Sequence, residues 1–356
     1  MMESYIRSRR PLSHFAEAIR RGAITVGFVG GSITEPEAGR RWSDKLVDWL
    51  IYRHPGLTVN VENAAKGATG SLSAIFRVEE DILNCGCDIV FVETAVNDGP
   101  PAFGACREGL LRKLLRQDRF DVVLVYTFCD GHYADLSEGR QPASVADWEE
   151  LAEHYRISSV FSGAYALELL NRGFVRWEEW LPDGLHPQQA GSRLYVEPIA
   201  KLLEDNLNAQ AESRNPLLEP LHPDHWEQAH ALAWPSVERI GPWRLTHERR
   251  LPSVTYMLFT ASLRAGLKCR FHGRGVILRR NVNGRAAGYR YRFDGGAWRA
   301  SDDALPDWGV NASDWVREEV LATDLPDGEH ELELYTTFAK GAKGSNFELA
   351  AIGVIR

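Results

Sequence analysis

The fold is decided by residues 23–34, which read AITVGFVGGSIT. The run before the glycines is short, apolar and rich in β-branched residues, and this predicts a buried strand. Gly30 and Gly31 allow a sharp turn, so we expect the hydroxyl of Ser32 at the C-terminal edge of a sheet, where ligands bind in open α/β folds. A tight turn capped by Ser32 or Thr34 is the plainer alternative. The glycines do not follow G-x-G-x-x-G, which disfavours nucleotide binding.

The same strand-and-helix unit repeats through the first 207 residues. Strand-like runs at 57–61, 88–93 and 122–128 alternate with helical patterns, a rhythm typical of a parallel sheet covered by helices. The helical patterns lie at 42–50, 71–83, 104–115, 145–155, 161–170 and 187–207. The sequence therefore predicts a three-layer α/β/α domain over residues 1–207.

The composition and the periodicity of the sequence change after Asn208. Residues 208–235 are rich in proline and lack a clear period, so we expect a linker or a wrapping segment. Residues 236–356 carry short alternating runs separated by Gly, Asn and Asp, which predict an all-β sandwich. A chain of 356 residues is long enough for two such domains.

Basic residues recur without an acidic one between Arg264 and Arg292. A surface for an anionic substrate is one explanation of such a run. A solvated sheet face, or docking onto the acidic first part of the chain, is favoured.

Composition and charge exclude several classes of protein. The chain is 44% hydrophobic and 25% charged, as in a globular protein that folds in water. A net charge of −8 argues against a nucleic-acid binder, and no apolar run approaches the roughly 18 residues of a membrane span. Residues 1–12 lack the apolar core of a secretory signal, and five cysteines fit reduced thiols. We therefore expect a cytoplasmic protein without nucleic-acid or membrane partners; whether it forms a homo-oligomer stays open.

A nucleophilic serine needs a base, and residues 183–187, Asp-Gly-Leu-His-Pro, offer one ahead of the last predicted helix. Asp183 and His186 are three residues apart and can lie in one turn. A carboxylate that accepts from one imidazole nitrogen leaves the other nitrogen to take the serine proton. Alternatively, Asp183 is a turn residue and His186 a surface histidine. A second cluster of His and Asp residues lies at 222–225. It does not follow a predicted strand that would position it in a site, which disfavours a metal-binding or catalytic role.

Two further loops supply hydrogen-bond donors for a developing oxyanion. Residues 63–70 follow the second predicted strand, and Gly67 leaves its backbone N–H open to approach. Residues 93–98 follow the third strand, and Asn97 offers a side-chain amide at the same edge. Taken singly, Gly67 is a loop glycine and Asn97 a turn residue. Taken together with Ser32, they predict a site for acyl chemistry.

These four blocks resemble those of the SGNH hydrolases, also called the GDSL-type esterase and lipase superfamily. The resemblance spans the first predicted domain and implies a flavodoxin-like, three-layer fold. It implies that Ser32 is the nucleophile, that His186 is the base and that Asp183 orients it. It also implies an oxyanion hole formed by Ser32, Gly67 and Asn97.

Two positions depart from the usual pattern of that superfamily. Gly31 stands where the first block has Asp, and Ala95 where the third block commonly has Gly. The Gly-Gly-Ser form occurs among members that look like carbohydrate esterases. The β-part resembles the jelly-roll module of some of those esterases, in which the module precedes the hydrolase domain.

From these residues and this resemblance we expect a serine esterase that hydrolyses an acetyl or similar small ester through an acyl-enzyme. The expected substrate is a small-molecule or oligosaccharide ester, and no cofactor or metal is required. An acyltransferase that uses the same serine is one alternative. A carbohydrate-binding protein with a vestigial site is another, disfavoured because the serine, the Asp-x-x-His pair and both oxyanion donors are all present.

Overall fold

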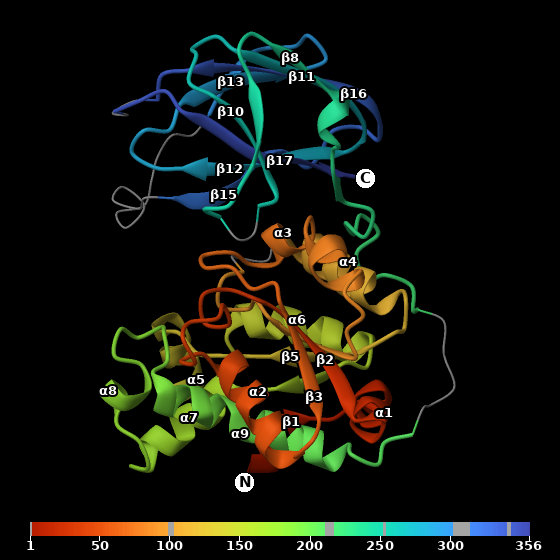
Figure 1. Ribbon diagram of the computed structural model, residues 1–356, viewed down its shortest axis with the longest axis vertical. Coiled ribbons are helices and arrows are strands. Elements are labelled where there is room, and N and C mark those ends of the chain that lie inside the picture. The colour runs from red at the N-terminus through yellow and green to blue at the C-terminus, as the bar shows by residue number, and fades with distance from the viewer. Residues whose placement is uncertain (1, 99–102, 211–216, 252–253, 302–313, 340–342) are drawn as a thin grey trace. The chain divides into compact units, whose positions relative to one another are not determined.

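The computed structural model describes residues 2–98, 103–210, 217–251, 254–301, 314–339 and 343–356. The chain divides after Glu227 into two compact units. The first contains strands and helices, and the second consists mainly of strands (Figure 1). The predicted order of an α/β domain followed by an all-β domain is confirmed.

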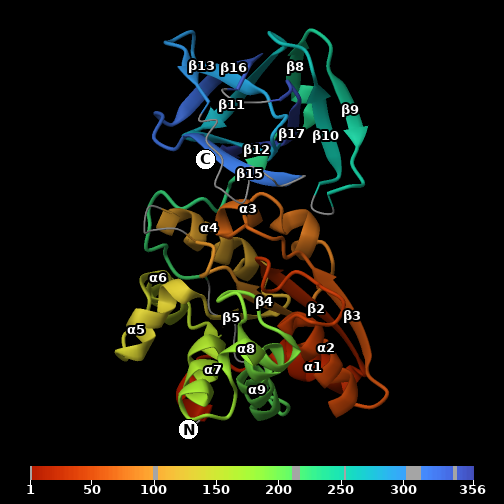
Figure 2. The same ribbon diagram turned by 90° about the vertical axis from the view of Figure 1, so that its left-hand side faces the viewer.

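The first unit is built on a six-stranded sheet with the order β1-β6-β5-β4-β2-β3. Figure 2 shows β5, β4, β2 and β3 following one another across it. Strands β2 to β6 are parallel, and β1 runs antiparallel to β6. The strands are β1 Ile6–Arg7, β2 Ala23–Gly30, β3 Thr58–Asn63, β4 Ile89–Glu93, β5 Asp121–Val125 and β6 Ser158–Val160. Because the strands are parallel, the C-terminal ends of β2, β3 and β4 share one edge, and the segments that follow them carry Ser32, Gly67 and Asn97. Asp183 and His186 lie in the segment between α8 and α9.

The helices of this unit cover the sheet, so every residue of β4 and β5 is buried. Helices α1, α2, α7 and α9 share one hydrophobic cluster with alternate strand residues such as Phe91 and Val123, while α4 contacts α3 and α6. The helices are α1 Ser13–Arg21, α2 Trp42–Arg53, α3 Ser71–Ala74, α4 Gly104–Leu115, α5 Tyr133–Ser137, α6 Ala143–His154, α7 Ser162–Asn171, α8 Trp177–Trp180 and α9 Gln189–Asp205. Within the described ranges, no helix is both long and apolar enough to cross a membrane.

The helix predicted over residues 71–83 is wrong as a single element. The segment forms α3 and a separate π-helical turn, Glu79–Leu83. Between them the Arg77 side chain is buried and donates to the carbonyl oxygen of Ala64 at 3.1 Å. This tertiary contact, rather than one amphipathic face, determines the path of the segment.

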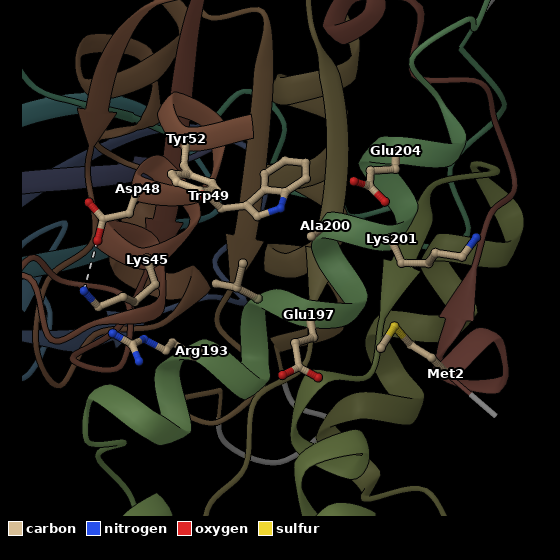
Figure 3. Close-up of a pocket in the computed structure, with 11 residues that line it drawn as sticks. Met2, Lys45, Asp48, Trp49, Tyr52, Arg193, Glu197, Ala200, Lys201 and Glu204 are labelled. Atoms are coloured by element: carbon tan, nitrogen blue, oxygen red, sulfur yellow. Dashed lines mark hydrogen bonds and ion pairs between the residues drawn. The ribbon is translucent and has the colours of Figure 1, made fainter. Parts of the chain in front are cut away.

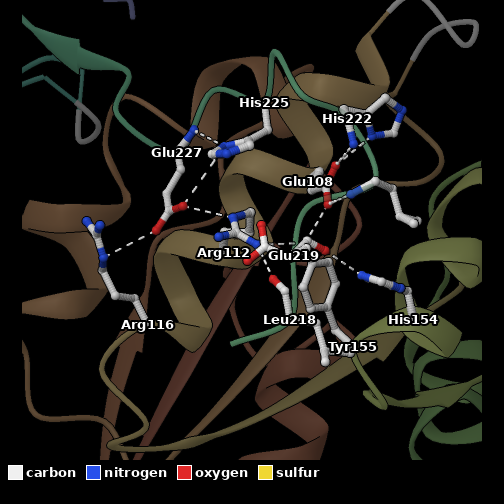
Figure 4. A network of polar contacts seen from close by, with 11 residues as sticks. Glu108, Arg112, Arg116, His154, Tyr155, Leu218, Glu219, His222, His225 and Glu227 are labelled. Carbon is white, nitrogen blue, oxygen red and sulfur yellow. Dashed lines mark hydrogen bonds and ion pairs between the residues drawn. The ribbon is translucent and has the colours of Figure 1, made fainter. Parts of the chain in front are cut away.

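Residues 217–227 belong to the first unit and lie against α4 (Figure 4). The buried Glu108 carboxylate on α4 accepts hydrogen bonds from the backbone N–H groups of Leu221 and His222, both at 2.7 Å. Part of the segment 208–235, for which we expected a linker or a wrapping arm, is therefore held by a buried carboxylate.

The second unit contains two antiparallel sheets, with the orders β15-β12-β17-β10-β9 and β14-β13-β16-β11-β8, and β7 pairs with β17. Both sheets contribute to one hydrophobic core; Leu278 and Leu349 come from the first sheet, and Leu267 and Leu332 from the second. The strands are β7 His230–Ala231, β8 Val237–Ile240, β9 Arg244–His247, β10 Tyr256–Thr260, β11 Gly266–Gly273, β12 Gly275–Val282, β13 Gly288–Phe293, β14 Arg299–Ala300, β15 Trp315–Ala322, β16 Gly328–Thr337 and β17 Phe347–Ile355. Two sheets that enclose one core form the predicted sandwich.

The basic run between Arg264 and Arg292 spans β11, β12, β13 and the segments that join them, and several of its members pair with glutamates of neighbouring strands. Arg280 lies 2.8 Å from Glu319 on β15, and Arg292 lies 2.9 Å from Glu333 on β16. Such cross-strand ion pairs involve Lys268, Arg270, Arg279, Arg280 and Arg292, which are five of the nine basic residues of the run. The pairing therefore accounts for part of the positive charge of the run.

Candidate active site

Ser32 lies in the tight turn that follows β2. The backbone N–H groups of Thr34 and Glu35 both donate to the carbonyl oxygen of Gly31, at 3.1 and 2.9 Å. The Ser32 Oγ lies 2.8 Å from Nε2 of His186, which is 154 residues away in sequence. The turn thus presents the hydroxyl at the C-terminal edge of the sheet, as the sequence predicts.

The two glycines before Ser32 are required by close packing. A Cβ atom on Gly30 would lie 2.8 Å from the carbonyl oxygen of Glu93 and 2.8 Å from Thr34 Oγ1. A Cβ atom on Gly31 would lie 2.0 Å from the side-chain oxygen of Asn97. An Asp at position 31 would therefore displace Asn97, which gives a physical reason for glycine at this position.

Asp183 and His186 lie in one turn and are joined by a hydrogen bond of 2.8 Å between Oδ2 and Nδ1. The other carboxylate oxygen accepts the backbone N–H groups of His186 at 2.7 Å and Leu185 at 3.0 Å. Desolvation acts to raise the pKa of Asp183, but these hydrogen bonds outweigh it and lower that pKa to about 2, although the side chain is 55% exposed. The carboxylate is therefore ionised across the neutral range and keeps its acceptor facing the imidazole.

Gly67 and Asn97 also lie beside the turn that carries Ser32. A Cβ atom on Gly67 would lie 3.6 Å from Cβ of Ser32, and the Asn97 amide packs against Gly31. Within the described part of the chain, the Asn97 side chain has no hydrogen-bond partner. The structure thus brings all five predicted site residues to one edge of the sheet.

Glu35 is a site residue that the sequence patterns missed. Its Oε2 accepts the backbone N–H of Gly67 at 2.8 Å, and its Oε1 lies 2.6 Å from Lys66 Nζ. The only sequence signal is a carboxylate three residues after Ser32, next to a proline. That signal does not predict the direction in which the Glu35 side chain points.

Glu93, the last residue of β4, was also missed. Its carboxylate is fully buried and accepts hydrogen bonds from Thr34 Oγ1 at 2.7 Å and Thr127 Oγ1 at 2.9 Å. Desolvation raises the pKa of Glu93 to about 7, although hydrogen bonds from Thr34, Thr127 and the backbone of Gly31 oppose the shift. Hydrogen bonds to Glu93 therefore connect Gly31 and Thr34, on either side of Ser32, to Thr127 in the segment that follows β5.

The second histidine cluster lies apart from this arrangement. His222 Nδ1 is 2.7 Å from the carboxylate of Glu108, and His225 Nδ1 is 3.9 Å from that of Glu227 (Figure 4). His222 thus helps to hold residues 217–227 on α4, whereas His225 pairs with Glu227 inside that segment. Among the residues that the structure describes, no group of three or more His, Cys, Asp or Glu side chains is arranged to hold a metal ion.

A groove of about 960 Å³ lies between α2 and α9, at a different place in the first unit (Figure 3). Trp49, Tyr52, Glu197 and Lys201 are among its lining residues. None of the loops that carry Ser32, Gly67, Asn97 or His186 contributes to it. The groove is therefore separate from the candidate active site.

Comparison with known proteins identifies the fold. No protein-family model and no curated protein sequence matches the chain. A solved two-domain esterase active on acetylated mannans is 21% identical and matches 99% of this chain and 98% of its own, with a TM-score of 0.84. The same type of esterase co-crystallised with mannopentaose is 20% identical and covers 99% and 97% of the two chains, again with a TM-score of 0.84. The chain therefore has the two-domain fold of that esterase.

A weaker likeness covers about half of the chain. An acetylxylan esterase from Geobacillus stearothermophilus is 18% identical and matches 51% of this chain and 94% of its own. Its TM-score of 0.41 is too low to support a structural argument.

The packing at Gly30 predicts that Gly30→Ala destabilises the first unit. The new methyl group would meet a backbone carbonyl that cannot move without distorting β4, so we expect a loss of about 1–3 kcal/mol in the free energy of unfolding. Urea denaturation measures this loss. Gly131→Ala is the matched control, because a Cβ there makes one ordinary contact of 3.7 Å with Cys129 Sγ. Equal stability of the two variants would contradict the packing argument.

The environment of Glu93 predicts a pH-dependent contribution to stability. In the unfolded chain the carboxyl loses its proton near its ordinary pKa of 4.5, whereas in the folded protein it holds the proton up to about pH 7. The contribution is therefore fully present below pH 4.5 and is lost as the pH rises to about 7. Glu93→Gln should reduce the difference in unfolding free energy between pH 5 and pH 7.5, measured by urea denaturation. The exposed Glu178→Gln serves as control, and an unchanged difference in Glu93→Gln contradicts the assignment.

Proposed function

We propose that this protein is a serine esterase of the SGNH type that removes acetyl groups from a carbohydrate. The observation that carries the proposal is the chain of two 2.8 Å contacts from Ser32 Oγ through the His186 imidazole to Asp183. A hydroxyl, an imidazole and a carboxylate in this order activate a serine for attack on an ester carbonyl.

The proposed reaction proceeds in two halves. Ser32 Oγ attacks the carbonyl carbon while His186 Nε2 takes the hydroxyl proton, and a tetrahedral intermediate forms. His186 then gives that proton to the departing sugar oxygen, which leaves an acyl-enzyme on Ser32. Water, deprotonated by His186, attacks the acyl-enzyme, and the collapse of the second intermediate releases acetate and restores the serine. The ionised Asp183 holds the imidazole in the required tautomer and stabilises the imidazolium.

The proposed oxyanion hole has three donors. They are the backbone N–H groups of Ser32 and Gly67 and the side-chain amide of Asn97. The proximity of Gly67 and Asn97 to the Ser32 turn supports this assignment, as does the unpartnered Asn97 amide among the described residues. Such donors act most strongly when charge develops on the carbonyl oxygen.

The proposed substrate class rests on the fold. The structures that match almost the whole chain are esterases active on acetylated mannans. We therefore propose an acetylated oligosaccharide as the substrate. An acyltransferase would share the first half-reaction and differ only in the acceptor. Acetate release in water, compared with transfer to an added sugar, distinguishes the two.

Kinetics of single and double variants test the proposed function. Ser32→Ala and His186→Ala should each lower kcat/KM on acetylated mannooligosaccharides by about 10⁴- to 10⁶-fold, and the double variant should lose little more because both groups act in one proton transfer. Ser137→Ala, a change at an exposed serine, serves as control. Near-wild-type turnover in either single variant would contradict the proposed triad.

A further inference from the structure

The backbone N–H of Gly67 is already occupied by Glu35. The carboxylate bridges the N–H at 2.8 Å and Lys66 Nζ at 2.6 Å. A Cβ atom on Gly67 would lie 3.0 Å from the carboxylate oxygen and 3.6 Å from Cβ of Ser32. The carboxylate therefore lies on the side of Gly67 that faces the serine, and a proposed oxyanion donor is satisfied by the protein itself.

An ester cannot use the Gly67 donor while Glu35 holds it. A backbone N–H makes one strong hydrogen bond, so the substrate carbonyl and the carboxylate compete for it. The competition is sharper in the tetrahedral intermediate, because a negative oxygen beside a carboxylate is strongly unfavourable. Glu35 must therefore leave Gly67 before the reaction, at the cost of a charge-assisted hydrogen bond.

We propose that Glu35 makes the active site selective for esters of polyhydroxylated alcohols, an inference that rests on the proposed function. When the carboxylate leaves Gly67, it keeps Lys66 as its cation and accepts hydrogen bonds from sugar hydroxyls near the ester. These hydroxyls replace the donor that Glu35 has lost. An aryl acetate offers no such donors, so it does not recover the free energy that is lost when Glu35 leaves Gly67. A loss of this kind is expected where the wrong substrate leaves a polar group of the site unpaired.

The surroundings of Glu35 support an exchange of partners rather than a fixed structural role. Its side chain is 30% exposed, so it can turn toward solvent or substrate. Glu37, two residues further along the same loop, pairs with Arg40 and Arg41 instead. Glu37 thus provides a more exposed carboxylate in the same loop whose ion pairs are with these arginines.

The test compares kcat/KM on p-nitrophenyl acetate and on an acetylated mannooligosaccharide for the wild type, Glu35→Ala and Glu35→Gln. Removing the competing carboxylate should raise the aryl-acetate value about tenfold in Glu35→Ala, the equivalent of one charge-assisted hydrogen bond. The sugar-ester value should stay level or fall, so the sugar-to-aryl ratio drops at least tenfold. Glu35→Gln, which keeps the shape of the side chain without its charge, should shift the ratio in the same direction. Glu37→Ala should change neither value.

Each other outcome overturns the inference. If aryl-acetate turnover falls or stays level in both Glu35 variants, the carboxylate does not obstruct the hole. If turnover of both substrates rises equally, Glu35 obstructs the hole but does not select the substrate. The proposed function is tested separately in the same assays, because it requires that wild-type turnover be lost in Ser32→Ala. If the wild type is active and the Glu35 variants have unchanged kcat/KM values, the proposed esterase activity is retained and only the proposed selectivity is rejected.

Discussion

The arrangement of the candidate site depends on one buried carboxylate, that of Glu93. It accepts hydrogen bonds from Thr34 after β2 and Thr127 after β5, and β4 places it between them. A carboxyl group without solvent is costly unless its oxygens are hydrogen-bonded, so these partners stabilise the arrangement in the folded protein. This constraint fixes the position of the Ser32 turn. His186 can then reach the serine from a loop 154 residues later in the chain.

Much of this could be predicted from the sequence because a parallel sheet brings the ends of its strands to one edge. The strand run at 88–93 corresponds to β4, and the first four residues of the run at 122–128 lie in β5. The residues after the strands therefore had to converge. Other features carried no such signal. Strands β1 and β6 have two and three residues, too few to show a period. Glu35 depends on the path of one loop, which no local pattern encodes.

Gly31, which departs from the usual SGNH pattern, affects the geometry of the candidate site. In place of the Asp that the SGNH pattern usually has, Gly31 leaves room for the Asn97 amide directly against the serine turn. Glu35 then supplies a carboxylate to the same site from the other end of the turn. The proposed site therefore combines three neutral oxyanion donors with a negative charge that can be displaced, an arrangement suited to a substrate that brings its own hydroxyl groups.

The central claim, that Ser32 is a nucleophile activated by His186, is tested most directly by covalent labelling. The protein is treated with a fluorophosphonate, digested and mapped by mass spectrometry. The account predicts one phosphonyl adduct, on Ser32, that is absent from Ser32→Ala and forms far more slowly in His186→Ala, because the imidazole must take the serine proton. An adduct on another residue, or equal labelling of Ser32 with and without His186, would contradict it.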